Sequence, residues 1–374
     1  MEPTNQKTIE AVDHFKRDII AHPAFDGILQ TILRNIRMPS DRRLIPVIGP
    51  TGVGKTAIMA TVIREVVAGC KRELKADVSL QPLVNITIDS QKSVTAAMKD
   101  MFSKILLGLD GLPPIRTNPA TCKTGADFHQ VSKKETENDL RNATYSLVKE
   151  RKPKVILIDE GQHLIKAKTG GEASFQFDAL KRIADECGVP IILIGHYDLY
   201  DFITGDAQLS RRSNCLHFAP YDWSKPKDKK AFITTVKSFA AYFQDQQISL
   251  DVSKPEYFFE LSLGCVGTLK TMLAEAYAEA LEQGLSTITV EMVDAHSSTF
   301  KSRKKMLTDI TFGRTLFSTT QEDQLQYRAQ LGLPADDTDS AISEQEKAAT
   351  RKTPVGVQKP KRNPVGIPEE LVTC

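Results

Sequence analysis

The segment GPTGVGKT, residues 49–56, constrains this chain more than any other feature, and it directly follows the apolar run LIPVIG. It matches the pattern G-x-x-x-x-G-K-[ST], which needs a buried strand before it and a helix after it. Residues 44–49 supply an apolar strand pattern and residues 55–68 a helical one. Glycines let backbone N–H groups curl around phosphate oxygens, and the helix N-terminus adds partial positive charge. We therefore expect a phosphate-binding loop at the end of a strand.

The residue types in this loop predict a magnesium nucleotide as ligand. Lys55 is expected to reach the β- and γ-phosphates of ATP, and Thr56 to ligate Mg²⁺. A second carboxylate beside the metal has to come from another strand end, and Asp159 is the candidate. The predicted nucleotide-binding residues are Gly49, Thr51, Gly52, Val53, Gly54, Lys55, Thr56 and Asp159, with Thr56 and Asp159 as the metal ligands.

The segment VILIDEGQHL, residues 155–164, has the pattern of a buried strand that ends in two carboxylates. Taken alone, it would more often be an ordinary strand end. Beside the phosphate loop, Asp159 is expected next to the magnesium ion. Glu160, one residue further, is expected to orient and deprotonate an attacking water molecule. We expect His163 to support the strand structurally.

Two further segments carry candidate catalytic residues. In ILIGHYDL (192–199), His196 follows a strand and is a candidate to sense the γ-phosphate, although it could instead only cap the strand. In LSRRSN (209–214), Arg211 or Arg212 could be an arginine finger acting on a neighbouring subunit's ATP, which is worth ~10³–10⁵ in rate. The alternative is a solvated basic turn, and the sequence does not choose between the two arginines.

Short apolar strands that alternate with helices predict an α/β fold with a five-stranded parallel sheet covered on both faces. The predicted strands are 44–49, 82–89, 155–159, 189–195 and 215–218. From 226 to 300 the pattern is helical. The expected organisation is an N-terminal helical segment (1–40), an ATPase core (41–222, with an insertion at about 109–138), a helical lid (223–310) and a flexible partner-binding tail (311–374).

Composition narrows the class of protein. The formal net charge is only +2, so nucleic-acid binding would have to depend on local basic patches. The six cysteines form no CxxC pair, which argues against a disulfide framework or a zinc site. No apolar run approaches the roughly 18 residues of a membrane span. We expect a cytoplasmic protein without a membrane partner.

Four features stand in one order: GPTGVGKT, VILIDE, ILIGHYD and SRR, followed by a helical lid. This order resembles the AAA+ ATPases over roughly residues 20–300. Within them, LIDEGQHL is similar to the IDE-x-x-H signature of the transposition regulators TnsC and TniB, relatives of MuB. FAPYDW (218–223) and the His-Pro pair at 22–23 also resemble segments of that family.

The resemblance implies a fold, an activity and a set of partners. Such proteins bind ATP between subunits, assemble into rings or helical filaments on double-stranded DNA without sequence preference, and link a target selector to a transposase. Hydrolysis then helps disassemble them. Here the transposase is expected to contact the tail. The selector is TniQ/TnsD-like, and both a CRISPR-associated complex and a DNA-binding subunit remain open. His196 occupies the sensor-one position, where relatives more often carry Asn, Thr or Ser. At the sensor-two position, Gly267 stands where many relatives have arginine, with Lys270 one turn on.

The expected DNA contacts are lysines in loops after the second and third strands, which would face the pore of a ring. They are Lys92, Lys123, Lys133, Lys134, Lys166 and Lys168. Each basic cluster taken alone is more often a solvated face. Two other functions stay open: a helicase loader or replication initiator, and a scaffold that uses ATP only to assemble. A helicase would need a second RecA-like domain, and 226–300 is too short and too helical for one.

Overall fold

The computed structural model describes residues 3–77, 80–90, 93–110, 136–166, 173–205 and 207–333. Residues up to Phe317 belong to one compact unit, and those from Ser318 onward to a second. The expected insertion at about 109–138 lies outside the described residues, apart from its ends. Among the helices of the described part, none is both long enough and apolar enough to cross a membrane.

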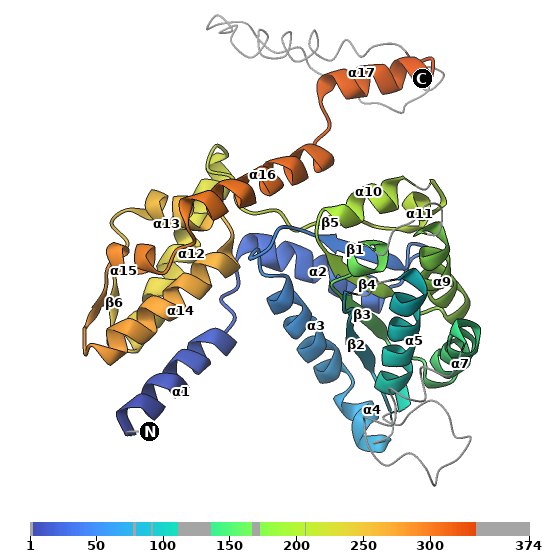
Figure 1. The fold of residues 1–374 in the computed structure, drawn as a ribbon, viewed down its shortest axis with the longest axis horizontal. Helices are drawn as coiled ribbons and strands as arrows, with labels where there is room; N and C mark the ends of the chain where they lie inside the picture. The colour runs from blue at the N-terminus through green and yellow to red at the C-terminus, as the bar shows by residue number, and fades with distance from the viewer. Residues whose placement is uncertain are drawn as a thin grey trace, which may run out of the picture. The chain divides into compact units, whose positions relative to one another are not determined.

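The first unit is built on a five-stranded parallel sheet with the strand order β2-β3-β4-β1-β5 (Figure 1). The strands are β1 (Leu44–Ile48), β2 (Leu83–Thr87), β3 (Val155–Asp159), β4 (Ile191–Gly195) and β5 (Leu216–His217). The predicted α/β fold class is confirmed. Because the strands are parallel, the carboxyl ends of β1, β3 and β4 meet at one edge of the sheet, with β4 between the other two.

Helices cover both faces of this sheet (Figure 1). Those with residues in the two cores are α2 (Pro23–Arg37), α3 (Lys55–Gly69), α5 (Val94–Asp110), α7 (Glu137–Arg151), α8 (His163–Lys166), α9 (Ala173–Cys187) and α10 (Asp198–Thr204). The same part of the chain also contains the short helices α4 (Lys71–Ala76) and α11 (Ala207–Arg212). The strands alternate between the faces: Ile45 and Val47 pack with α2 and α3, whereas Leu44 and Ile48 pack with α5, α9 and α10. This alternation between two covered faces explains why every residue of β1 is buried.

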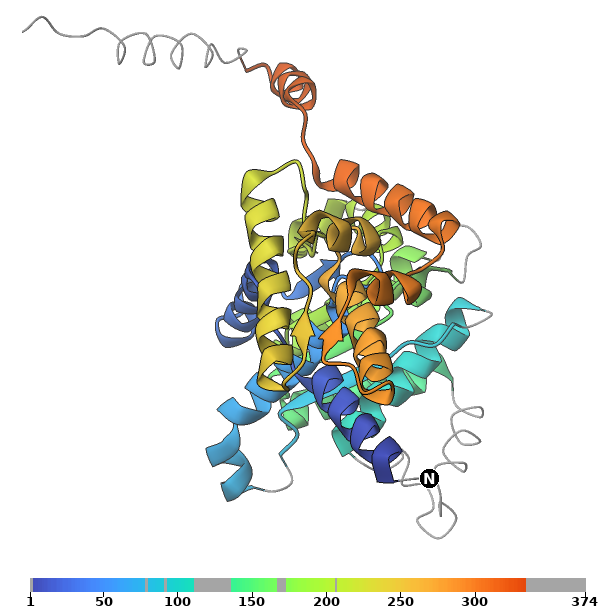
Figure 2. The ribbon, with the colours of Figure 1, turned by 90° about the vertical axis from the view of Figure 1, so that its left-hand side faces the viewer.

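The lid follows β5 and contains α12 (Pro226–Asp245), α13 (Pro255–Ser262), α14 (Val266–Glu282) and α15 (Val290–Ala295). Between the helices lies a small parallel pair, β6 (Ser249–Leu250) with β7 (Thr287–Ile288), which the helical pattern did not predict. The first helix, α1 (Pro3–Arg17), packs against α14 (Figure 2). Its fully buried Phe15 contacts the rings of Tyr242, Phe243 and Tyr277. The segment predicted over 1–40 therefore divides, with α1 in the lid core and α2 on the sheet.

The expectation of a flexible tail from residue 311 is wrong for residues 311–317, which belong to the first unit. Helix α16 (Phe300–Phe317) continues past 310, and α17 (Gln321–Gln330) follows in the second unit. The end of α16 is held by tertiary contacts: Phe317 stacks on His217 at a centroid distance of 4.1 Å, and a Cβ on Gly313 would overlap the Tyr197 ring. Thr320 caps α17 with a capping box. The expectation rested on the weak apolar periodicity of this segment, and periodicity does not predict contacts with distant parts of the chain.

Candidate nucleotide site

The phosphate loop connects β1 to α3, where the sequence predicts it. Gly52 and Gly54 have φ of +78° and +117°, a backbone conformation that would strain any side chain. Val53 is buried under the loop, whereas Thr51 and Thr56 are exposed. Because α3 starts at the next residue after Gly54, its free N–H groups face the space in front of the loop.

Lys55 lies against the loop itself. Its Nζ donates hydrogen bonds to the carbonyl oxygens of Gly49 at 2.7 Å and Pro50 at 2.9 Å. Burial lowers the pKa of Lys55 to about 8, and the negative charges of Glu160 and Asp159 oppose that shift. The lysine and the two carboxylates therefore share one electrostatic environment, although Lys55 starts the helix after β1, the carboxylates stand at the end of β3, and β4 lies between these two strands.

Asp159 and Glu160 stand at the end of β3, as predicted. The Asp159 Oδ1 accepts a hydrogen bond of 2.9 Å from the Glu160 N–H. Burial raises the pKa of Asp159, against the opposing effects of that hydrogen bond and of Lys55. Glu160 has φ of +56°, which is rare for a residue with a side chain and is often found at functional sites. Oxygen ligands of the Asp159 and Thr56 kind suit Mg²⁺, which binds through few protein groups and takes its other ligands from phosphates and water.

Two neighbours surround the Glu160 carboxylate. The amide of Gln162 donates a hydrogen bond to Oε2 of Glu160. His163 Nε2 lies further away, at 3.8 Å from the same oxygen. Gln162 was not among the predicted site residues. Its only signal in the sequence is its place two residues after Glu160, because a single sequence does not reveal that its side chain is buried.

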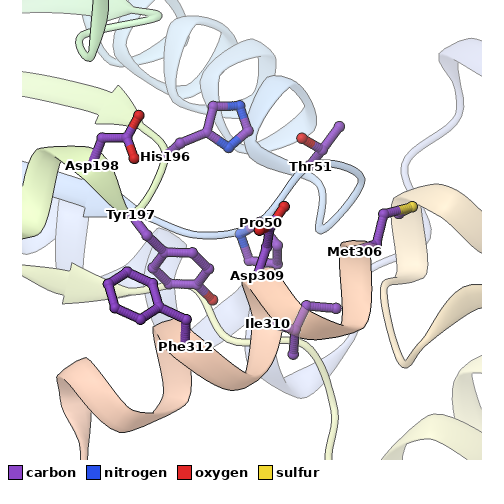
Figure 3. Close-up of a pocket in the computed structure, with 9 residues that line it drawn as sticks. All are labelled: Pro50, Thr51, His196, Tyr197, Asp198, Met306, Asp309, Ile310 and Phe312. Carbon is purple, nitrogen blue, oxygen red and sulfur yellow. The ribbon is translucent and has the colours of Figure 1, made fainter. Parts of the chain in front are cut away.

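His196 follows β4 and lines a pocket of about 290 Å³ (Figure 3). Three parts of the chain form the walls: the phosphate loop, the end of β4 and helix α16. The lining residues are Pro50, Thr51, His196, Tyr197, Asp198, Met306, Asp309, Ile310 and Phe312. His196 therefore follows a strand, as the sequence predicts, and lines the same pocket as Pro50 and Thr51 of the phosphate loop. The sequence did not predict that α16 forms a wall of this pocket.

The two arginines of α11 differ in their surroundings. Arg212 forms an ion pair with Asp185 of α9. Arg211 is exposed and has no ion-pair partner among the described residues. The structure thus separates two residues that the sequence left equivalent.

Of the six lysines predicted to contact DNA, one belongs to the described part of the chain. Five of them lie outside the described residues: Lys92, Lys123, Lys133, Lys134 and Lys168. Lys166 is the last residue of α8, and its side chain is not described.

The lid reaches the phosphate loop at the start of α14. A Cβ on Gly267 would lie 2.6 Å from the carbonyl oxygen of Gly52, so residue 267 has no room for the arginine that many proteins of the resembled family carry there. Lys270 does not replace it, since its Nζ donates to the carbonyl oxygens of Lys16 and Asp18. An apolar recess of about 40 Å³ lies beside this contact. Residues of the N-terminal segment, the loop and the lid line it.

His22 is one of the residues lining this recess. Its Nδ1 lies 2.9 Å from the hydroxyl of Tyr221 and also accepts from the Phe25 N–H, capping α2. Burial lowers the pKa of His22 to about 4, so the ring is neutral at physiological pH. His22 and Tyr221 thereby join the His-Pro pair at 22–23 to FAPYDW (218–223), the two segments that resemble parts of TnsC and TniB.

Residues 36–203 match the family model described as the AAA domain, so this part of the chain is similar to that family. The protein is a nucleotide-binding enzyme that hydrolyses ATP. A search of curated proteins found no match.

Several solved structures are similar at low identity. The ADP form of the Aeropyrum pernix ORC2 protein is 13% identical, with a TM-score of 0.48, over 75% of this chain and 71% of that one. Domain III of the Thermotoga maritima replication initiation protein DnaA is 15% identical, with a TM-score of 0.43, over 79% and 95%. The Thermotoga maritima RuvB Holliday junction branch migration motor is 14% identical, with a TM-score of 0.42, over 86% and 87%.

Proposed function

We propose that this protein is an ATP-dependent, DNA-binding regulator of DNA transposition. In this proposal it assembles with ATP on double-stranded target DNA, links a target selector to a transposase, and disassembles after hydrolysis. The observation that carries the nucleotide-dependent part is the convergence of Lys55, Asp159 and Glu160 at one edge of the sheet. These groups can hold the phosphates, hold the metal and activate water.

Each of these side chains has a separate task in the proposed reaction. Lys55 would neutralise the β- and γ-phosphates, to which the N–H groups at the start of α3 also donate. Thr56 and Asp159 would hold Mg²⁺, which stabilises the charge that develops on the phosphate oxygens. Glu160 would accept the proton of the attacking water molecule. His196 lines the adjoining pocket and would contact the γ-phosphate side of the nucleotide.

The arginine acting in trans is proposed to be Arg211. Arg212 already pairs with Asp185 of its own chain, and pulling it away would leave that carboxylate without its partner. Arg211 is exposed and can reach a neighbouring subunit without such a loss. This assignment requires self-assembly, because the finger completes the site of another copy.

The transposition role rests on the resemblance to TnsC and TniB. It is supported by the contact between His22 and Tyr221, since two separate family-like segments meet there beside the phosphate loop. The lysines at 92, 123, 133, 134, 166 and 168 remain our candidates for DNA phosphate contacts. Phosphate contacts of this kind make binding steeply dependent on salt and nearly independent of sequence.

We propose that the transposase binds from residue 318 onward. Residues up to Phe317 belong to the first unit, and Phe317 stacks there on His217. In α17 and just after it, Leu325, Tyr327 and Leu331 are 49%, 63% and 54% exposed. Exposed apolar side chains on a helix are a common way to bind a protein partner.

Electron microscopy of the full-length protein with linear duplex DNA tests the proposal. Rings or filaments on DNA are expected with ATP, and free protein is expected with ADP. Raising the salt concentration should release the ATP-bound protein from DNA of any sequence. Absence of DNA association with ATP would overturn the proposal. Binding confined to one DNA sequence would favour the alternative of a replication initiator.

A further inference from the structure

Gln162 connects the end of β3 to the end of β4. Its side chain is buried, with 2% of the residue exposed. The amide nitrogen donates to Oε2 of Glu160, and the amide oxygen accepts from the His196 N–H at 3.2 Å. One amide therefore contacts both the proposed base and the residue at the sensor-one position.

These two contacts determine how the amide is oriented. A carboxylate can only accept hydrogen bonds and a backbone N–H can only donate one, so reversing the amide would face donor with donor and acceptor with acceptor. Because Gln162 is buried, its amide atoms would be left without partners in the reversed orientation, which is costly. The Nε2 of Gln162 is thus held toward Glu160.

The surrounding backbone leaves little room for adjustment. The Gly161 N–H donates to the carbonyl oxygen of Ile194 at 2.8 Å, and a Cβ on Gly161 would lie 2.5 Å from Leu193 Cδ1. The turn after β3 is therefore packed directly on β4. Glu160, which precedes Gly161 in this turn, has positive φ, and its carboxylate accepts from the Gln162 amide.

We propose that Gln162 is a positioning residue that holds the Glu160 carboxylate for water activation and couples its direction to the end of β4. The inference rests on the proposed role of Glu160 as the general base. A shift of the β4 end, where the His196 side chain lines the pocket, would move the His196 N–H and with it the Gln162 amide. Hydrolysis would thus depend on the contents of that pocket.

His163 does not perform this task in the structure. Its Nε2 is 3.8 Å from Glu160 Oε2, beyond the range of a hydrogen bond, whereas Gln162 makes a direct one. A variant at Gln162 is therefore expected to affect turnover through Glu160 even though His163 is unchanged.

Two substitutions separate positioning from a structural role. Gln162→Met keeps the length of the side chain and removes both hydrogen bonds. Gln162→Glu keeps the oxygen that accepts from His196 and replaces the donor that faces Glu160. Gln283→Met is the matched control, because Gln283 is an exposed lid residue that bonds to Glu279. ATP turnover, KM and thermal stability would be measured for the full-length proteins at pH 8.

Both Gln162 variants are expected to lose roughly 10- to 100-fold in kcat, the cost of a misplaced catalytic group, with KM unchanged. The control should match the unmodified protein. If Gln162→Glu turns over normally, the residue only secures β4 and the inference is wrong. If both variants also lose thermal stability and have a raised KM, the loss of kcat reflects a damaged structure, and the inference is likewise wrong.

Glu160→Gln, assayed in parallel, separates the two proposals. Slow turnover in that variant is expected. If Glu160→Gln hydrolyses ATP normally, the assignment of the base is wrong and Gln162 has no base to position. The assay contains no DNA, so its result does not depend on the transposition role.

Discussion

The Thr268 N–H donates a hydrogen bond of 2.8 Å to the carbonyl oxygen of Gly52, and this bond joins the lid to the phosphate loop. It uses the first turn of α14, whose N–H groups have no partner within the helix. The neighbouring Gly267 allows the close approach. Any change that separates these two backbones should weaken the binding of the nucleotide.

Gly267→Ala is expected to weaken ATP binding by about tenfold or more, an energy of about 1.4 kcal/mol. The added methyl group would lie 2.6 Å from Gly52 O and would have to displace either the loop or the lid. Gly27→Ala is the matched control, because a Cβ there meets nothing within 4 Å. Titration with a fluorescent ATP analogue would show the difference, and equal affinities would contradict this account.

Lys55→Ala and Glu160→Gln are expected to act in opposite directions on assembly. The first removes the charge that faces the phosphates, so ATP-dependent assembly on DNA should be lost. The second leaves ATP binding intact and blocks hydrolysis, so assemblies should persist longer. Light scattering after ATP addition would follow both, and the same behaviour in the two variants would refute the assigned roles.

His22 should make stability depend on pH. Burial lowers its pKa to about 4, from 6.5 in the unfolded chain. Between these values the unfolded state binds a proton that the folded state does not, so the free energy of unfolding falls as pH falls. At pH 5 the loss relative to neutral pH is about 2 kcal/mol from this residue.

Urea unfolding of His22→Gln at pH 7 and pH 5 measures this contribution. Burial also lowers the pKa of His217 to about 4, so the share of His22 is the difference between variant and unmodified protein. His14→Gln is the control, since the His14 side chain is 69% exposed. A pH dependence that His22→Gln leaves unaltered would show that the ring is not held neutral by burial.

Arg211→Ala is expected to reduce DNA-stimulated ATP turnover by ~10³-fold or more if it acts as the finger. Arg212→Ala should cost only about 0–1 kcal/mol of stability, because its ion pair with Asp185 is half-exposed. Mixing Arg211→Ala with Lys55→Ala should restore part of the activity, since one copy supplies the finger and the other the phosphate loop. No recovery in the mixture would argue against action in trans.

Truncation after Phe317 should separate DNA binding from transposase recruitment. The contacts of Phe317 with His217 and Tyr200 remain in that protein, so its melting temperature should change little. Filter binding should show normal ATP-dependent DNA affinity, while a pull-down should recover no transposase. Loss of DNA binding would place the DNA contact in the tail instead.

Much of the nucleotide site could be predicted from the sequence because its signals are local. A glycine loop must follow a strand and precede a helix, and Asp159 and Glu160 directly follow an apolar strand. In a parallel sheet all such strand ends meet at one edge, so the proximity of these carboxylates to Lys55 follows from the fold class. The six proposed DNA lysines had no comparable signal, since charged residues usually mark only a solvated face.

The tertiary structure decided the contacts between distant segments. His22 and Tyr221 are 199 positions apart, and nothing in either segment specifies the other. The same holds for α16, which lines the pocket at β4 with Met306, Asp309, Ile310 and Phe312, and for α1, which packs in the lid core. Arg211 and Arg212 are equivalent in sequence and differ only because Asp185 lies beside one of them. The periodicity of apolar residues indicates which face of a helix or strand is buried. Only the tertiary packing determines which other element covers that face.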